Sequence, residues 1–265
     1  MRRNGLFWGI IIIVIGFLFL LDNLKLLPVS AWALIWPAFL IIIGLWLLFG
    51  RAIFRGNQPE NKLAIPLEQA SQADIRINHG AGRLSIAALP NSDQFLTGDF
   101  IGGVDNEITR EGTRISARLS TPSEIFWGIP WMGMSDGFSW QINLNPEVAL
   151  DLTLKTGASE NKLNLTDLKV TNLNLDTGAS STSIYLPAHS GYTKANVHAG
   201  AASVDIIFPQ NVAGRVRIQS GLAGININNA RFPQNGSFYQ SPGFDSAEDK
   251  VEMYIETGVG RISIA

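Results

Sequence analysis

The stretch Leu154–Ser159 (LKTGAS) returns 21 residues further on as Leu175–Ser180 (LDTGAS), and looser copies of it recur on both sides. Every copy has an apolar residue three positions before a central glycine, with alternating apolar and polar residues around it. The six central glycines are Gly80, Gly157, Gly178, Gly200, Gly221 and Gly258. The steps between the last five are 21, 22, 21 and 37 residues. A fixed period near 21 with period-two alternation predicts stacked coils of short β-strands.

The segment Leu163–Leu175 illustrates one predicted coil. It reads as three apolar-polar-apolar triplets separated by two-residue polar corners. Its Leu and Val side chains would point inward, and its backbone would pair with the coils above and below. A glycine at a corner permits either a positive φ or a close approach between backbones, and we expect one of the two at each central glycine. The longer step before Gly258 predicts an insertion, for which Phe232–Lys250 is the obvious candidate.

These patterns predict an all-β domain over residues 71–265, built as a parallel β-solenoid whose coils span roughly 21 residues. A leucine-rich repeat is the nearest alternative fold. One coil does contain Leu165-x-x-Leu168-x-Val170, but no repeat leaves room for a helix, so we favour the solenoid.

The front of the domain, residues 83–150, is less regular and would form either wider coils or an antiparallel cap. Strand-like runs lie at Phe95–Ile101, Thr113–Leu119 and Ser139–Leu144. The first and last central glycines are followed by closely matched sequences, Arg83–Ile86 (RLSI) and Arg261–Ile264 (RISI). We therefore expect these two segments to hold equivalent positions in the stack.

Two apolar stretches, Leu6–Leu21 and Ala31–Gly50, precede the β-domain. A helix that spans a bilayer needs about 20 apolar residues. The second stretch has that length without a charge, and the first reaches it if flanking residues share the interface. The polar turn Asp22–Lys25 between them suits a helical hairpin. The predicted organisation is a transmembrane hairpin over 1–55 with spans at about 6–25 and 31–50, a linker over 56–70, and the β-domain.

Four arginines, Arg2, Arg3, Arg51 and Arg55, flank the open side of the hairpin. The positive-inside rule therefore predicts that both termini and the β-domain face the cytoplasm. A cleaved signal peptide is an alternative reading of the first stretch, with Val29–Ala31 as a loose cleavage site, but that site lies far from the end of the apolar run.

Composition excludes several classes of function. The net charge is −2 and no Lys/Arg cluster marks a phosphate-binding face, so we expect no nucleic-acid partner. The absence of cysteine excludes a disulfide scaffold, a thiolate metal site and a Cys nucleophile. The glycine motifs precede no helix, which argues against a phosphate loop. We expect no catalytic site, cofactor, metal or small-molecule substrate.

The position two residues before each central glycine is polar in every copy. These residues are Asn78, Lys155, Asp176, His198, Gln219 and Glu256. If successive coils stack about 4.8 Å apart, they form an outward ladder of weak cross-strand pairs. An alternative is that Asp176 and Glu256 act as a glycosidase-like acid pair. His79 would make a turn hydrogen bond, and His189 lies in a loop without a carboxylate nearby in sequence.

One segment stands out for its aromatic and methionine side chains. Its members are Phe126, Trp127, Trp131, Met132, Met134, Phe138 and Trp140. One interpretation is a cap over the open end of the core, where strand edges would otherwise be exposed. The other is a loop that contacts the membrane interface or a partner, which suits Trp and Met side chains.

The chain resembles LiaF-like cell-wall-active antibiotic response proteins over nearly its whole length. The hairpin resembles the LiaI/LiaF-type transmembrane region through Gly9, Gly16, Leu20–Asn23, Trp36-Pro37, Leu40-Ile41 and Gly44. The glycine repeats resemble the toastrack β-domain. This resemblance implies a bacterial membrane protein that acts in envelope-stress signalling, in part by restraining a membrane histidine kinase. Better-studied members have more transmembrane helices than the one hairpin expected here.

We therefore expect a non-enzymatic, membrane-anchored accessory of envelope-stress signalling that acts through protein contacts. Its expected partners are the lipid bilayer and a membrane protein, such as a sensor kinase or homologous subunits. The alternative is a structural or adhesin-like scaffold that self-associates through its edge strands.

Overall fold

The computed structural model describes residues 36–37, 39–41, 60–90, 92–122 and 138–265. Most of the two predicted membrane spans, 6–25 and 31–50, lies outside these residues. Trp36, Pro37 and the segment 39–41 are helical. Among the residues described, no helix has the length and apolar character needed to cross a membrane.

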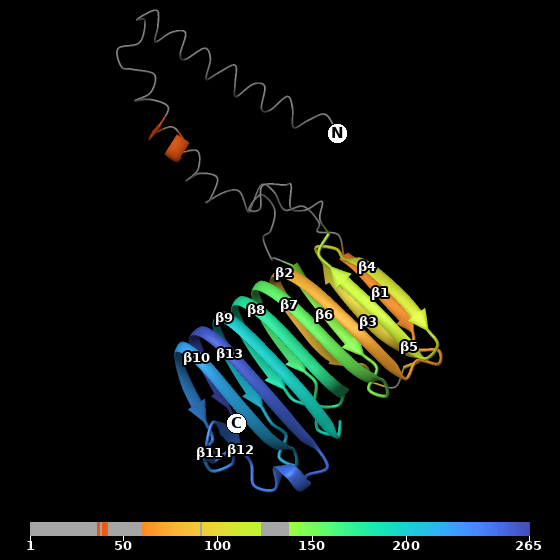
Figure 1. The fold of residues 1–265 in the computed structure, drawn as a ribbon. Coiled ribbons are helices and arrows are strands. Elements are labelled where there is room, and N and C mark those ends of the chain that lie inside the picture. The colour runs from red at the N-terminus through yellow and green to blue at the C-terminus, as the bar shows by residue number, and fades with distance from the viewer. Residues whose placement is uncertain (1–35, 38, 42–59, 91, 123–137) are drawn as a thin grey trace, which may run out of the picture. The chain divides into compact units, whose positions relative to one another are not determined.

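The β-domain consists of thirteen strands joined in one hydrogen-bonded network (Figure 1). Six of the strands are long, with fifteen to seventeen residues each, and they lie side by side in parallel. The elements are β1 (Glu60–Pro66), β2 (Gln72–Ala88), β3 (Gln94–Ile101), β4 (Asp105–Glu111), β5 (Arg114–Ser120), β6 (Phe138–Leu144), β7 (Ala149–Asn164), β8 (Lys169–Tyr185), β9 (Tyr192–Ile207), β10 (Ala213–Ile227), β11 (Gln234–Asn235), β12 (Phe238–Gln240), the 3-10 helix η2 (Phe244–Ser246) and β13 (Lys250–Ile264).

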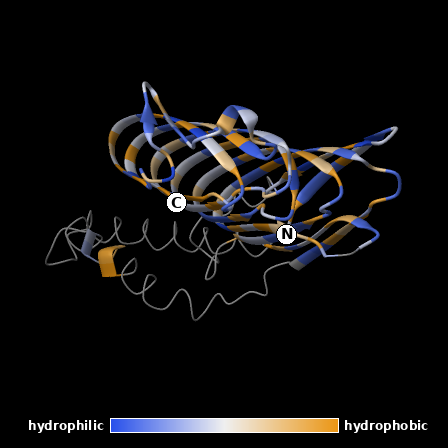
Figure 2. Ribbon diagram, turned by 90° about the horizontal axis from the view of Figure 1, so that it is seen from below, coloured by the Kyte–Doolittle hydropathy of each residue, from blue (hydrophilic) through white to orange (hydrophobic). Residues whose placement is uncertain are grey.

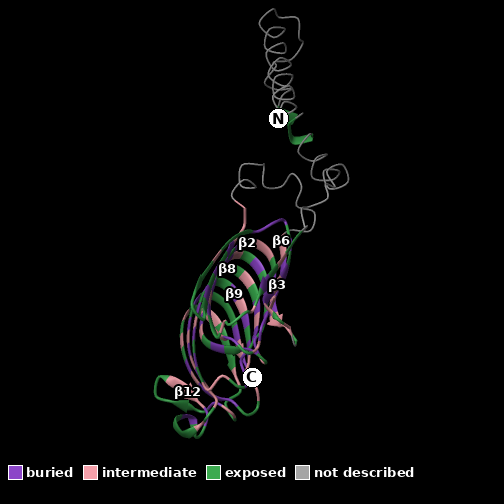
Figure 3. Ribbon diagram, turned by 90° about the vertical axis from the view of Figure 1, so that its right-hand side faces the viewer, coloured by how far each residue is buried: buried purple, intermediate pink, exposed green. Residues whose placement is uncertain are grey.

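Each long strand bends at its central glycine, so that it has a first arm before the glycine and a second arm after it. In the register of β2 with β7, His79 faces Thr156 and Ala81 faces Ala158, with the glycines at the bend between them. Hydrophobic and hydrophilic residues alternate along the strands (Figure 2), and buried and more exposed residues alternate along both arms of rungs such as β2 and β7 (Figure 3). The buried side chains of the two arms form one apolar core. We call each bent strand a rung.

The predicted three-triplet coil is not what forms. The second arm of β7 ends at Asn164, and a tight turn in which the Leu168 N–H donates to the Leu165 carbonyl at 3.0 Å leads into β8. The inward apolar side chains predicted for this segment are all buried. The strands are longer than predicted because parallel neighbours pair along both arms, so that one rung needs only two changes of direction.

Close backbone approach explains five of the six central glycines, all except Gly80. A Cβ on Gly157 would lie 2.3 Å from the Gly80 carbonyl oxygen, and one on Gly258 would lie 2.8 Å from that of Gly200. None of the six has a positive φ. Positive φ occurs instead two residues later at Gly82 and Gly260, with values of 120° and 141°. This shared conformation confirms that the RLSI and RISI segments hold equivalent positions.

The order of the rungs differs from the order of the sequence. The parallel stack runs β2-β7-β8-β9-β13-β10, so the last strand of the chain lies between β9 and β10. The predicted insertion over Phe232–Lys250 contains β11, β12 and η2. Val216 of β10 pairs with Tyr239 of β12 in an antiparallel ladder, which leads the chain back along the outer edge of β10 before β13 begins. Simple sequential stacking was therefore the wrong prediction for the last two rungs.

The front of the domain is an antiparallel cap, one of the two arrangements predicted. β5 pairs with the first arm of β2 and β6 with its second arm, so the two short strands together form one more rung. β4 adds to β5, and β3 and then β1 add to β6, all antiparallel. β1 lies within the predicted linker 56–70, which is a correction. Ile65 of β1 is buried opposite Leu96, so this segment belongs to the domain.

Candidate functional site

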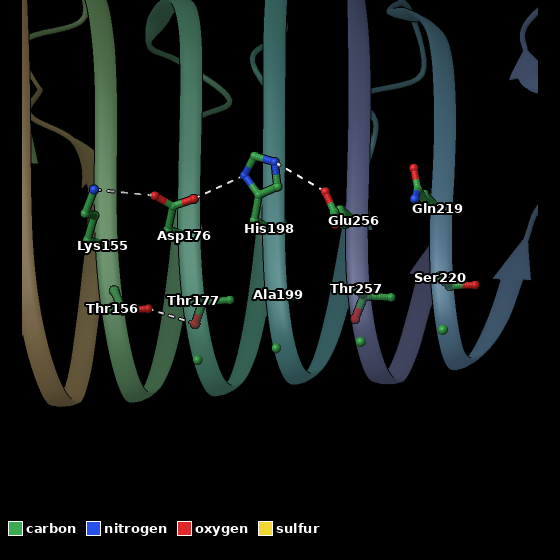
Figure 4. Close-up of a pocket in the computed structure, with 14 residues that line it drawn as sticks. Lys155, Thr156, Asp176, Thr177, His198, Ala199, Gln219, Ser220, Glu256 and Thr257 are labelled. Carbon is green, nitrogen blue, oxygen red and sulfur yellow. Dashed lines mark hydrogen bonds and ion pairs between the residues drawn. The ribbon is translucent and has the colours of Figure 1, made fainter.

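The predicted outward ladder forms on the first arms of the rungs, next to the bends (Figure 4). Cross-strand pairing places Lys155 beside Asp176, Asp176 beside His198, and His198 beside Glu256. In the ladder Gln219 comes after Glu256, because β13 lies between β9 and β10. Repeat spacing was thus sufficient to predict the members of the ladder, and the order of the last two required the topology.

Close side-chain contacts link the members of the ladder to one another. Lys155 Nζ lies 3.8 Å from Asp176 Oδ2, and His198 Nδ1 lies 3.1 Å from Asp176 Oδ1. His198 Nε2 lies 3.9 Å from Glu256 Oε2. These side chains are 49–63% exposed, so each pair contributes little to stability. The ladder presents a polar surface whose side chains contact one another.

A groove of about 730 Å³ follows the ladder along the bends. Its walls combine the ladder side chains with Thr156, Thr177 and Thr257 and with the corner glycines. Among the described residues, no Phe, Tyr or Trp side chain lines it. Asp176 and Glu256 lie on opposite sides of His198, each within ion-pair distance of it, so they face the histidine rather than a shared gap. The groove offers hydrogen-bonding groups to an extended polar ligand or protein surface.

A second row of polar side chains lies on the inner side of the bends. The sequence analysis did not predict this buried row. The Thr156 hydroxyl donates to Thr177 Oγ1 at 2.8 Å. Asn161 Nδ2 donates to Thr156 Oγ1 at 3.2 Å and to Thr182 Oγ1 at 3.0 Å. All four residues are buried. The recurrence of Thr directly before the central glycine was the available signal for this row.

His79 occupies the same inward row at the front of the stack. The turn hydrogen bond predicted for it does not form: the side chain is 1% exposed, and neither ring nitrogen has a partner among the described residues. Burial lowers the pKa of His79 to about 4, because the imidazolium would lose its hydration. The ring packs against Trp140 at a centroid distance of 4.9 Å.

Two members of the predicted aromatic contact segment are described. Trp140 is fully buried against Phe100, with ring centroids 5.2 Å apart, so it cannot contact a partner and that prediction was wrong. Phe138 is half-buried, near the ring of His79. Both residues belong to β6 and pack as part of the cap. The other five members, Phe126, Trp127, Trp131, Met132 and Met134, lie outside the described residues.

His189 has a carboxylate neighbour that sequence distance concealed. Its Nδ1 lies 3.6 Å from Asp249 Oδ2, and the Gly191 N–H donates to the other oxygen of Asp249 at 2.9 Å. This contact joins the loop before β9 to the start of β13. No group of three or more His, Asp or Glu side chains in the described part of the chain is arranged to hold a metal ion.

Comparison with known proteins agrees with this architecture. Residues 6–48 match the LiaI-LiaF-like transmembrane region. A solved structure from Clostridium sporogenes, described as "a putative cell adhesion protein", has a TM-score of 0.71 at 20% identity and covers 78% of this chain and 98% of its own. A "putative adhesin" from Bacteroides fragilis gives a TM-score of 0.27 at 9% identity, over 78% of this chain and 97% of its own.

No curated protein matches the sequence. The family model for the N-terminal domain of toast_rack (DUF2154) matches residues 54–207, which is more than half of the chain. That match includes the front cap and the rungs β2, β7, β8 and β9. The chain therefore belongs to the toast_rack family and joins a toast_rack domain to a LiaI-LiaF-like transmembrane region.

Proposed function

We propose that this protein is a non-enzymatic, membrane-anchored accessory of the cell-envelope stress response, acting through protein–protein contacts. The observation that carries the proposal is the joining of a LiaI-LiaF-like transmembrane region to a toast_rack domain in one chain. The hairpin holds the domain at the bilayer, and the domain contacts a membrane partner. A sensor kinase or a homologous subunit is the partner class that this role requires.

The outward face of the first arms supports a contact role. Its ladder combines a lysine, a histidine and two carboxylates that contact one another, so binding does not depend on one strongly charged partner. The next outward row continues this polar surface, and Asn196 Nδ2 donates to Asn174 Oδ1 at 2.9 Å. A rigid surface of this kind suits recognition of a folded protein, in which complementary shape and hydrogen bonding give specificity.

The test is deletion of the gene, followed by complementation in cells challenged with cell-wall antibiotics. We expect the deletion to change induction of the envelope-stress response and the full chain to restore it. Residues 60–265 without the hairpin should fail to restore it when produced at the same level. An unchanged response in the deletion strain would contradict the proposal.

We place the β-domain on the cytoplasmic side of the membrane, on the strength of the four arginines that flank the hairpin. The chain has no cysteine and Ser237 is exposed between β11 and β12, so a single Ser237→Cys substitution gives a clean probe. A membrane-impermeant maleimide should label this variant only after the cells are permeabilised. Labelling of intact cells would reverse the orientation.

The second candidate is an adhesive or structural scaffold. In the described residues no strand covers the outer edge of the second arm of β10, which favours this candidate because such edges are templates for strand pairing between molecules. The structure from Clostridium sporogenes that shares this fold is described as "a putative cell adhesion protein". A scaffold predicts that deletion changes cell cohesion or surface attachment and leaves antibiotic induction unchanged, which separates it from the accessory role.

A further inference from the structure

The second arm of β10 ends the stack with an open outer edge. β12 pairs with β10 only at Arg215 and Val216, both in the first arm. In the part of the chain that the structure describes, no strand pairs with the outer side of Leu222–Ile227. An unpaired edge of this kind presents a row of backbone N–H and C=O groups to which another strand can bond.

This edge also leaves part of the core uncovered. Ile225 pairs with Ile262 and Ile227 with Ile264, so both continue the inward rows of β13. Ile262 and Ile264 are buried, whereas Ile225 is 43% exposed because no rung lies beyond it. Leu222, at the bend, is 82% exposed. A strand added here would cover apolar side chains as well as pair with the backbone.

The other ends of the network are protected by charge, proline or a covering strand. β4 (DNEITRE) carries four charged residues, and β1 (ENKLAIP) carries Glu60, Lys62 and a terminal proline. β12 covers the beginning of β10. Charges and proline on an edge are the usual means of preventing strand pairing between molecules. The segment Ile218–Ile227 (IQSGLAGINI) has neither.

We infer that the second arm of β10 is a docking strand for a second copy of this chain, paired antiparallel about a two-fold axis. In the described residues, apart from the two-residue strand β11, the second arm of β10 is the one uncharged and uncovered edge, so the matching edge on another copy is its own β10. Two identical neutral strands have no charges to repel each other. A two-fold pair closes on itself, whereas pairing with β1 or β4 of the next copy would engage charged edges and give an open filament.

The edge is short, and a standard stable interface between soluble proteins buries more surface than one pair of short strands. Anchoring both copies in the same membrane raises their effective concentration, so that a modest contact suffices. The pairing is independent of the proposed stress-response role, since it follows from the edge alone.

Single-cysteine variants of the full chain in native membranes test the inference. An antiparallel two-fold pair places one residue opposite its own copy, so oxidation should give a disulfide-linked dimer at one or two positions within 222–228, with yield falling on either side. Thr109→Cys on β4 should give no dimer. A scan of 222–228 without a dimer would overturn the inference. So would dimers that form only when a β10 cysteine is combined with a β1 or β4 cysteine.

A charge placed on the edge provides the matched control. Asn226 is exposed and points outward, so Asn226→Lys should leave the fold intact and lower the dimer yield of the best cysteine position severalfold. Ser183 lies in the same outward row on β8, three rungs away from β10. Ser183→Lys should therefore leave the yield unchanged. Thermal unfolding shows whether the two lysine variants are folded. An undiminished yield in folded Asn226→Lys would also overturn the inference.

Discussion

The ring of His79 packs against the indole of Trp140, with centroids 4.9 Å apart and ring planes inclined by 55°. The two side chains come from adjacent strands at the front of the stack, β2 and β6. Neither the His79 nitrogens nor Trp140 Nε1 has a hydrogen-bond partner among the described residues. Through this contact the cap packs against β2, the first full rung. The contact requires a neutral imidazole.

Acid should therefore weaken the domain through His79. Its folded-state pKa of about 4 is below the ordinary value of 6.5, so the unfolded chain binds the proton more readily. The stability is fully present above pH 6.5 and falls as the pH decreases towards 4. The shift corresponds to a loss of about 3 kcal/mol. Chemical denaturation between these pH values measures it.

His79→Thr is the informative variant, because Thr occupies this position on β7, β8 and β13. The slope of unfolding free energy against pH should flatten in this variant between pH 4 and 6.5. Asn78→Gln, which changes an exposed ladder residue that does not ionise, should keep the wild-type slope. Equal slopes in wild type and His79→Thr would show that His79 does not titrate as described.

Two glycines at the same repeat position should respond differently to alanine. In Gly157→Ala the new Cβ would lie 2.3 Å from the Gly80 carbonyl oxygen, so neighbouring rungs must separate. In Gly80→Ala the nearest atom is Thr121 Oγ1 at 3.9 Å, an ordinary contact. We expect Gly157→Ala to lose about 1–3 kcal/mol of unfolding free energy, and Gly80→Ala to lose far less. Equal losses would mean that close approach is not what selects glycine.

The inner hydroxyl row should be sensitive at Thr156, which bonds to both Thr177 and Asn161. Thr156→Val keeps the side-chain volume but leaves buried partners unsatisfied, at a cost of about 1–3 kcal/mol. Thr156→Ser retains the hydroxyl and should recover most of that loss. Urea denaturation of the two variants gives the comparison, and similar stability for Val and Ser would count against a role for these bonds.

Arg231 should be the most important arginine for stability at the far end of the stack. Its guanidinium donates to the carbonyls of Phe208, Pro209 and Val212, with distances of 2.8 Å to the first and 3.1 Å to the last. Arg231→Gln would leave part-buried carbonyls without donors and cost about 2–3 kcal/mol. Arg83→Gln, which breaks an exposed pair with Glu160, should change stability by no more than about 0.5 kcal/mol. Equal losses in these two variants, measured by chemical denaturation, would contradict the role of Arg231.

The repeat and the ladder could be predicted because both follow from local spacing. The glycine period located the bends, and the position two residues earlier located Lys155, Asp176 and His198 on one outward row. The placement of β13 could not be predicted, because it depends on pairing between distant segments. Gly221 and Gly258 carry equivalent motifs, and either strand fits beside β9 by pattern alone.

Burial at the front of the domain was harder to predict. Trp140 and Phe138 end an aromatic-rich segment whose composition also suits a contact surface, and only pairing with β2 and β3 places Trp140 in the core. His79 resembled a turn residue because Thr or Ser holds the same position in four other copies. β1 was missed because its seven residues carry too little alternation to predict a strand.

Site-specific cross-linking in native membranes tests the proposed contact role most directly. A photoreactive residue in place of Asn174 or Asn196 probes the outward face of the first arms, and one in place of Thr109 on β4 serves as the control. We predict an adduct between the first-arm positions and a membrane signalling protein, with a yield that changes on antibiotic challenge. The absence of any protein adduct from the first arms, before and after challenge, would contradict the proposed role.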